Sequence, residues 1–151
     1  MRVALDINVL AYAEGVNGAA RQDTAVALLR QLPEESAVVP VQALGARAQS
    51  GLAGKPRSRS NPRRRDAFAL APTTEAAMIS TIDLAADQRL GIWGSLMVSV
   101  ATDSGCRMLL SEDLQDGFSW RGVTIVNPFS VNRHPFLEAL LAGNSGSTPV
   151  P

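Results

Sequence analysis

The segment Leu90–Phe129 reads LGIWGSLMVSVATDSGCRMLLSEDLQDGFSWRGVTIVNPF and contains the clearest structural signals of the chain. Residues 93–102 are apolar on nearly every side, which is typical of a buried helix. The run RMLLS at 107–111 predicts a strand that ends at the acidic pair Glu112 and Asp113. A buried helix that leads directly into a buried strand favours an α/β architecture.

The same alternation of strands and helices continues on both sides of this segment. Thr73 is the expected N-cap of the helix that follows it, because its hydroxyl can accept a bond from the first turn. Strands separated by helices predict a three-layer α/β domain, in which a central parallel sheet carries helices on both faces. Strands are expected at 2–5, 37–39, 67–71, 107–111 and 123–126, and helices at 8–13, 19–32, 41–52, 74–88, 93–102 and 134–141.

The length of 151 residues fits one domain of ordinary size. We assign residues 1–142 to this domain and residues 143–151, GNSGSTPVP, to a flexible C-terminal tail. Hydrophobic residues make up 46% of the chain and the formal net charge is zero. These values exclude an intrinsically disordered chain and a uniformly basic protein that coats nucleic acid.

Cellular location is inferred from what the sequence lacks. No apolar run reaches the roughly 18 residues that a membrane span needs, and the first residues do not have the layout of a secretory signal. Because Cys106 is the single cysteine, an internal disulfide and a cysteine-based metal cluster are excluded. We therefore expect a cytoplasmic protein that does not enter a membrane.

Two of the predicted strands are followed by carboxylates, Asp6 after 2–5 and Asp113 after 107–111. The carboxyl ends of parallel strands meet at one edge of a sheet, so these side chains are expected to lie close together. Clustered carboxylates repel one another unless a cation neutralises them, and Mg²⁺ prefers oxygen ligands. One interpretation is a metal centre that cleaves phosphodiesters. The other is that each Asp caps the helix after its strand.

Three stretches resemble the PIN-domain family, and in particular its VapC toxin branch. DINVLAYA at 6–13 resembles the opening motif, and VVPVQALG at 38–45 resembles the segment that leads into the second acidic motif. Residues 90–129 resemble the third and fourth motifs, with LLSEDLQDG after GCR as the most specific part. The likeness follows the family order over nearly the whole chain. It implies a PIN fold and a metal-dependent endoribonuclease that uses four acidic residues.

Carried over residue by residue, the resemblance places the first acid at Asp6 and the fourth at Asp113. Both would be catalytic residues and metal ligands, with Asp116 as an auxiliary catalytic carboxylate. Ser111 resembles the small hydroxyl residue of the family that orients the site by hydrogen bonding. Asn8 is expected either to bond Asp6 or to cap the first helix, and the cap is the favoured interpretation.

The second and third acidic positions depart from the family pattern. The second motif usually reads LGE and reads LGA here, so Ala46 replaces a glutamate; the third usually reads WDA and reads WGS, so Gly94 replaces an aspartate. Loss of one preorganised catalytic group commonly costs roughly 100- to 1000-fold in rate. We therefore expect a catalytically impaired or inactive protein. The alternative is an active endoribonuclease toxin of a toxin–antitoxin pair, which would need Mg²⁺ or Mn²⁺.

The segment Lys55–Arg65, KPRSRSNPRRR, is strongly basic. Clustered arginines contact RNA phosphates without reading the base sequence, so an RNA-binding role is one interpretation. The other is an ordinary solvated loop, which is the more common role of a charge run. The RNA-binding candidates in this segment are Arg57, Arg59, Arg63 and Arg64.

The resemblance also implies partners. VapC-type proteins pair with a small VapB-like antitoxin and usually form homodimers, so we expect RNA, an antitoxin and a second copy of the chain as candidate partners. Trp93 and Trp120 are interpreted as core or dimer-contact residues.

Overall fold

The computed structural model describes residues 2–15, 18–32, 36–41, 69–87 and 90–145. Its described strands form one sheet in the order β3-β2-β1-β4-β6-β5, and every neighbouring pair is parallel except β5 and β6. The strands are β1 (Arg2–Leu5), β2 (Ala37–Pro40), β3 (Ala69–Ala71), β4 (Cys106–Leu110), β5 (Ser119–Trp120) and β6 (Val123–Val126).

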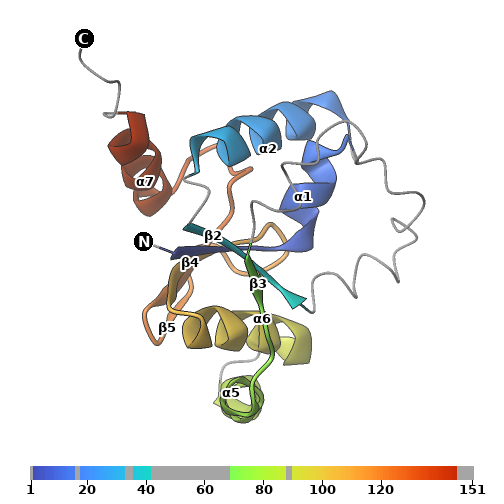
Figure 1. Cartoon of the computed structure of the whole chain (residues 1–151), viewed down its shortest axis with the longest axis vertical. Coiled ribbons are helices and arrows are strands. Elements are labelled where there is room, and N and C mark those ends of the chain that lie inside the picture. Colours follow the sequence, from blue (N-terminus) through green and yellow to red (C-terminus); the bar gives the residue numbers. More distant parts are fainter. Residues whose placement is uncertain (1, 16–17, 33–35, 42–68, 88–89, 146–151) are drawn as a thin grey trace.

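Helices cover both faces of this sheet (Figure 1). One face carries α1 (Ile7–Ala13), α2 (Ala19–Gln31) and α7 (Pro135–Ser145), and the other carries α5 (Glu75–Asp87) and α6 (Gly91–Asp103). The expected three-layer α/β architecture is therefore confirmed. The expected helix at 41–52 lies outside the described residues apart from Val41.

The core lies between the central strands and the helices on either side. Side chains of β1, β4 and β6 such as Leu5, Leu109 and Ile125 have no exposed area, because a central parallel strand is covered on both faces. Helix α6 is buried over most of its length, as its apolar sequence predicts. No helix of the described residues is long and apolar enough to cross a membrane.

The N-cap of α5 is Thr74, so the expectation of Thr73 is wrong by one residue. The backbone N–H of Ala77 donates to the Thr74 Oγ1 at 3.0 Å, and this hydroxyl donates in turn to Asp103 Oδ2 at 2.9 Å. A side chain that caps α5 and also bonds α6 joins the two helices of this face, which explains why the second of two adjacent threonines is used.

Strand β5 was not expected from the sequence. It pairs with β6 through a two-residue turn at Arg121 and Gly122, whose φ angles are 45° and 86°. Positive φ at both turn positions is the primed geometry that matches the twist of a hairpin, and glycine adopts it without strain.

Helix α7 runs to Ser145, beyond the end that the sequence predicts for it. Its last turn therefore uses the first three residues of the expected tail. Residues 146–151 lie outside the described residues, and the division into a domain and a tail stays a prediction.

Candidate functional site

The carboxyl ends of β1, β4 and β6 meet at one edge of the sheet. The ladder aligns Leu5 with Leu110 and Leu110 with Val126. It continues one residue further, since Asp6 N donates to Leu110 O at 3.0 Å and Ser111 N donates to Val126 O at 3.1 Å. The backbone thereby fixes Asp6 and Ser111 side by side at this edge.

Ser111 joins the two predicted catalytic acids. Its hydroxyl donates to Asp6 Oδ2 at 2.8 Å and accepts from the backbone N–H of Asp113 at 3.3 Å. Ser111 is fully buried and Asp6 is 6% exposed, so this bond satisfies a carboxylate that is almost removed from water. The orienting role expected for Ser111 agrees with this geometry.

Asn8 contacts the second of these acids, since its Nδ2 donates to Asp113 Oδ2. Helix α1 begins at Ile7, which places Asn8 inside its first turn and not at the cap position. The expectation that Asn8 caps this helix is therefore wrong. Its amide side chain reaches across the edge to the loop after β4, a pairing that the sequence did not reveal.

Asp116 has a structural contact at the base of the same loop. Its Oδ1 accepts from the backbone N–H of Asn127 at 2.9 Å, and Gly117 N donates to Ile125 O at 2.8 Å. Together these bonds tie the loop that follows β4 to the end of β6. The predicted auxiliary acid is thus held near the edge by a backbone donor.

Glu112 turns to helix α2, where it forms an ion pair with Arg21. The guanidinium of Arg21 also lies 5.3 Å from the ring centre of Tyr12 and 5.5 Å from that of Phe129. These rings pack edge to face with 5.0 Å between their centres. The pairing engages Glu112 with α2, whereas its neighbour Asp113 bonds to Asn8.

Gly94, at the third acidic position of the family, is buried against apolar side chains. A Cβ atom added there would lie 2.8 Å from Leu114 Cδ2 and 3.9 Å from Leu90 Cβ. Leu114 follows Asp113 directly and packs against the hydrophobic core. This part of the edge is therefore apolar where the family carries a carboxylate.

The remaining predicted site residues lie outside the described residues. Ala46, at the second acidic position, belongs to this group. So do the four RNA-binding candidates, Arg57, Arg59, Arg63 and Arg64.

The donor set at the edge does not fit a divalent ion as it stands. One oxygen of Asp6 and one of Asp113 already accept hydrogen bonds from neighbouring side chains. Among the described residues, no group of three or more His, Cys, Asp or Glu is placed to hold a metal. Mg²⁺ usually binds through one or two carboxylates together with waters and phosphate oxygens, so here it would have to compete with Ser111 and Asn8 for the carboxylates of Asp6 and Asp113.

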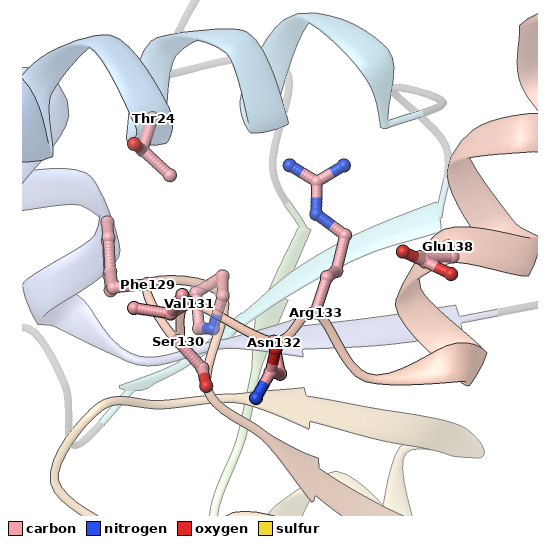
Figure 2. A pocket seen from close by; sticks show the side chains of 8 residues that line it. Thr24, Phe129, Ser130, Val131, Asn132, Arg133 and Glu138 are labelled. Atoms are coloured by element: carbon pink, nitrogen blue, oxygen red, sulfur yellow. The ribbon is translucent and has the colours of Figure 1, made fainter.

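A cleft of about 530 Å³ lies apart from these acids, between α2, the segment after β6 and α7. Figure 2 shows the Arg133 side chain extending into this space, with Thr24 and Glu138 beside it. Neither Asp6 nor Asp113 lines the cleft. Its lining residues are Thr24, Pro128, Phe129, Ser130, Val131, Asn132, Arg133 and Glu138.

A mostly parallel sheet between two helix layers, with carboxylates after two central strands, defines the class of α/β domains whose sites form at the carboxyl edge. No family model and no curated protein matches the sequence. Several solved structures do match the fold.

FitAcB from Neisseria gonorrhoeae matches with a TM-score of 0.64 and 14% identity over 85% of this chain and 99% of that one. A toxin–antitoxin complex from Klebsiella pneumoniae matches with a TM-score of 0.65 and 14% identity over the same shares. The sarcin–ricin loop cleaving toxin VapC20 of Mycobacterium tuberculosis matches with a TM-score of 0.58 and 13% identity, over 74% of this chain and 91% of that one. The chain therefore has the VapC-type PIN-domain fold.

Proposed function

We propose that this chain is a cytoplasmic VapC-like protein of the metal-dependent endoribonuclease lineage whose catalytic centre is impaired or inactive. It acts by binding an antitoxin-like partner or RNA and not by efficient cleavage. The main support for the proposal is the bonding of the carboxylates at the sheet edge, because Asp6 and Asp113 accept hydrogen bonds from Ser111 and Asn8. In addition, Gly94 has no side-chain oxygen at the third acidic position.

The physical argument concerns metal occupancy. A divalent ion would have to displace Asn8 from Asp113 and then bind with two of the four family acids replaced. Each lost ligand weakens binding and removes stabilisation of the negative charge in the transition state. The groups of such a centre act as a unit, so their losses do not simply add.

Calorimetric titration of the purified protein with Mn²⁺, combined with a ribonuclease assay in Mg²⁺, tests the proposal. We expect no micromolar binding and cleavage at least about 100-fold slower than that of VapC20 assayed alongside. Asp6→Asn should leave both readouts unchanged. Magnesium-dependent cleavage that this substitution abolishes would overturn the proposal.

The rival function is an active endoribonuclease toxin. Its support is that Asp6 and Asp113 both bond Ser111 at one edge, with Asp116 nearby in sequence and on the same loop. Under this alternative Mg²⁺ or Mn²⁺ binds Asp6 and Asp113, and Asp116 contributes to catalysis. Loss of cleavage on Asp116→Asn, with the fold intact, would favour the rival.

An antitoxin is the first candidate partner, because the matching structure from Klebsiella pneumoniae is described as a toxin–antitoxin complex. Co-expression with any small open reading frame that lies beside the gene tests this role. We expect the neighbour's product to co-purify with this chain in a fixed ratio. Separate elution of two well-folded proteins would exclude that partner.

A second copy of the chain is the next candidate partner. Helix α5 exposes Met78, Ile79 and Ile82 on its outer side, and the first turn of α6 exposes Ile92 and Trp93. Ile82 is 64% exposed and Ile92 is 67% exposed. Several large apolar side chains on adjacent helices favour a protein contact. The proposed homodimer uses this face.

Light scattering during gel filtration tests the dimer. We expect the wild type to elute as a dimer and Ile82→Glu to elute as a monomer. Ala27→Glu is the matched control, since Ala27 is exposed on α2 across the sheet. A monomeric wild type, or an Ile82→Glu dimer of undiminished stability, would contradict the proposal.

RNA is the third candidate partner and depends on Arg57, Arg59, Arg63 and Arg64. Replacing all four with alanine should weaken binding of single-stranded RNA in fluorescence anisotropy. The slope of log K against log salt should fall by about 3, since each phosphate contact on a single strand contributes roughly 0.7. A control with Arg30 and Arg133 replaced should keep the slope.

A further inference from the structure

We propose that Leu114 closes the third acidic position, so that the carboxylate lost at Gly94 cannot be restored by changing residue 94 alone. This inference deepens the proposed function and rests on it. It concerns the Gly94–Leu114 contact, which we call the apolar plug. The plug would exclude a metal ligand even from a chain that regained an aspartate at this position.

The first reason is steric. Carbon atoms in contact normally lie about 3.5–4.0 Å apart, whereas a Cβ at position 94 would lie 2.8 Å from Leu114 Cδ2. The Cβ is the first atom of an aspartate side chain, so the conflict arises before the carboxylate is reached. The atom in conflict is the terminal methyl of a partly buried side chain, so Leu114 would have to rotate and repack against the hydrophobic core to admit the Cβ.

The second reason is electrostatic. The position is buried within α6, and its described neighbours are the side chains of Leu114 and Leu90. A carboxylate beside these apolar carbon atoms gains no hydrogen bond from them, which disfavours its ionised form. Metal binding requires the ionised form. Leu114 therefore opposes a ligand at position 94 by its apolar character as well as by its volume.

The position of Leu114 in the chain strengthens the inference. It directly follows Asp113, whose carboxylate bonds Asn8 and whose backbone N–H bonds Ser111. The backbone beside Leu114 is thus fixed by hydrogen bonds on the polar part of the edge. Relief of the contact with Gly94 would therefore have to come from rotation of the Leu114 side chain, which packs against the core.

Metal binding by four proteins tests the plug: the wild type, Gly94→Asp, Leu114→Ala and the double variant. Calorimetric titration with Mn²⁺ is expected to give at least about tenfold tighter binding in the double variant than in Gly94→Asp. Leu114→Ala alone should gain nothing. The double variant with Asn in place of Asp at position 94 is the matched control for charge, and it should not bind.

The results of these titrations test the apolar plug and the proposed function separately. Equal Mn²⁺ affinity of Gly94→Asp and the double variant would overturn the plug, as would no binding by a folded double variant. Micromolar binding by the wild type would instead overturn the proposed function. Circular dichroism verifies the fold of each variant before titration.

An alanine cycle keeps the inference testable if the aspartate variants fail to fold. Gly94→Ala adds the Cβ alone, and in the wild-type background it is expected to lower the melting temperature because of Leu114. In the Leu114→Ala background it should raise the melting temperature, since alanine is the better helix former and fills the vacated space. A shift of the same sign in both backgrounds would overturn the plug.

Discussion

The polar side chains at the two ends of strand β4 have different surroundings. At the amino end, Cys106 is buried, and this burial raises the pKa of its thiol from 9.0 to about 11, partly opposed by the charge of Arg2. At the carboxyl end, Ser111 is more deeply buried but donates a hydrogen bond to Asp6. One end keeps its titratable group neutral, whereas the other surrounds its carboxylates with donors.

The comparison shows which end of β4 presents polar groups that can take part in binding. A neutral thiol packed in the core is inert, since the thiolate is the reactive form. At the carboxyl end, Ser111 and Asn8 donate hydrogen bonds to Asp6 and Asp113, so the polar groups there are held in fixed positions. The carboxyl end of β4 therefore gathers hydrogen-bonded polar groups, even though the apolar plug occupies part of the same edge.

The largest expected effect is that of Ser111→Ala. It removes the hydroxyl that bonds both Asp6 and the backbone of Asp113 in a fully buried position, so it should cost about 1.5–3 kcal/mol of unfolding free energy. Urea denaturation measures the loss. Ser119→Ala, at an exposed position of β5, removes only a 3.2 Å contact with the Thr124 hydroxyl and should cost about 0.5 kcal/mol. Equal losses would show that the buried hydrogen bonds of Ser111 contribute no more than the contact of Ser119.

The bond between Asn8 and Asp113 should have a smaller effect, because it lies at the surface. A double-mutant cycle with alanine at both positions is expected to give a coupling of about 0.5–1 kcal/mol in urea denaturation. A coupling of zero would mean that Asn8 does not hold Asp113, and it would weaken the argument that Asp113 is already partnered.

Asp116→Ala should cost about 0.5–1 kcal/mol, since it removes the acceptor of the Asn127 N–H. Asp116→Asn keeps an acceptor oxygen and should cost almost nothing. Hydrogen exchange at the Asn127 amide should accelerate in the alanine variant alone. Unchanged exchange in that variant would show that Asp116 does not fasten the loop to β6.

The smallest effect at neutral pH concerns Cys106. Because its folded pKa exceeds the unfolded value, the contribution to stability is complete below pH 9 and is lost as the pH rises from 9 through about 11. Cys106→Ala should remove this alkaline decline in denaturation experiments. Rapid alkylation of the folded wild type at pH 8 would contradict the assignment of an inert thiol.

The sequence predicted the central strands because each is a short apolar run bounded by a clear end signal. Asp6 ends β1 and Asn127-Pro128 ends β6, and both strands match their predicted bounds. Strand β5 was missed because two residues are too few to form a periodic pattern. The correct threonine cap of α5 was missed because the choice depends on Asp103, a residue of another helix.

The residues of the candidate site follow from the sequence, whereas their contacts do not. Family motifs pointed to Asp6, Ser111 and Asp113, which the fold brings together. The bond from Asn8 to Asp113 joins residues 105 positions apart, so no local signal reveals it. The contact of Gly94 with Leu114 is equally dependent on tertiary structure, because a glycine in a sequence does not indicate what fills the space beside it.

Both outermost strands of the described sheet are very short, with three residues in β3 and two in β5. Pro72 directly follows β3 and has no N–H to donate to an added strand. Such short edge strands offer few backbone N–H and C=O groups to an incoming chain, which disfavours extension of the sheet into fibrils. The proposed pairing of two copies is therefore expected to use side chains and not to extend the sheet.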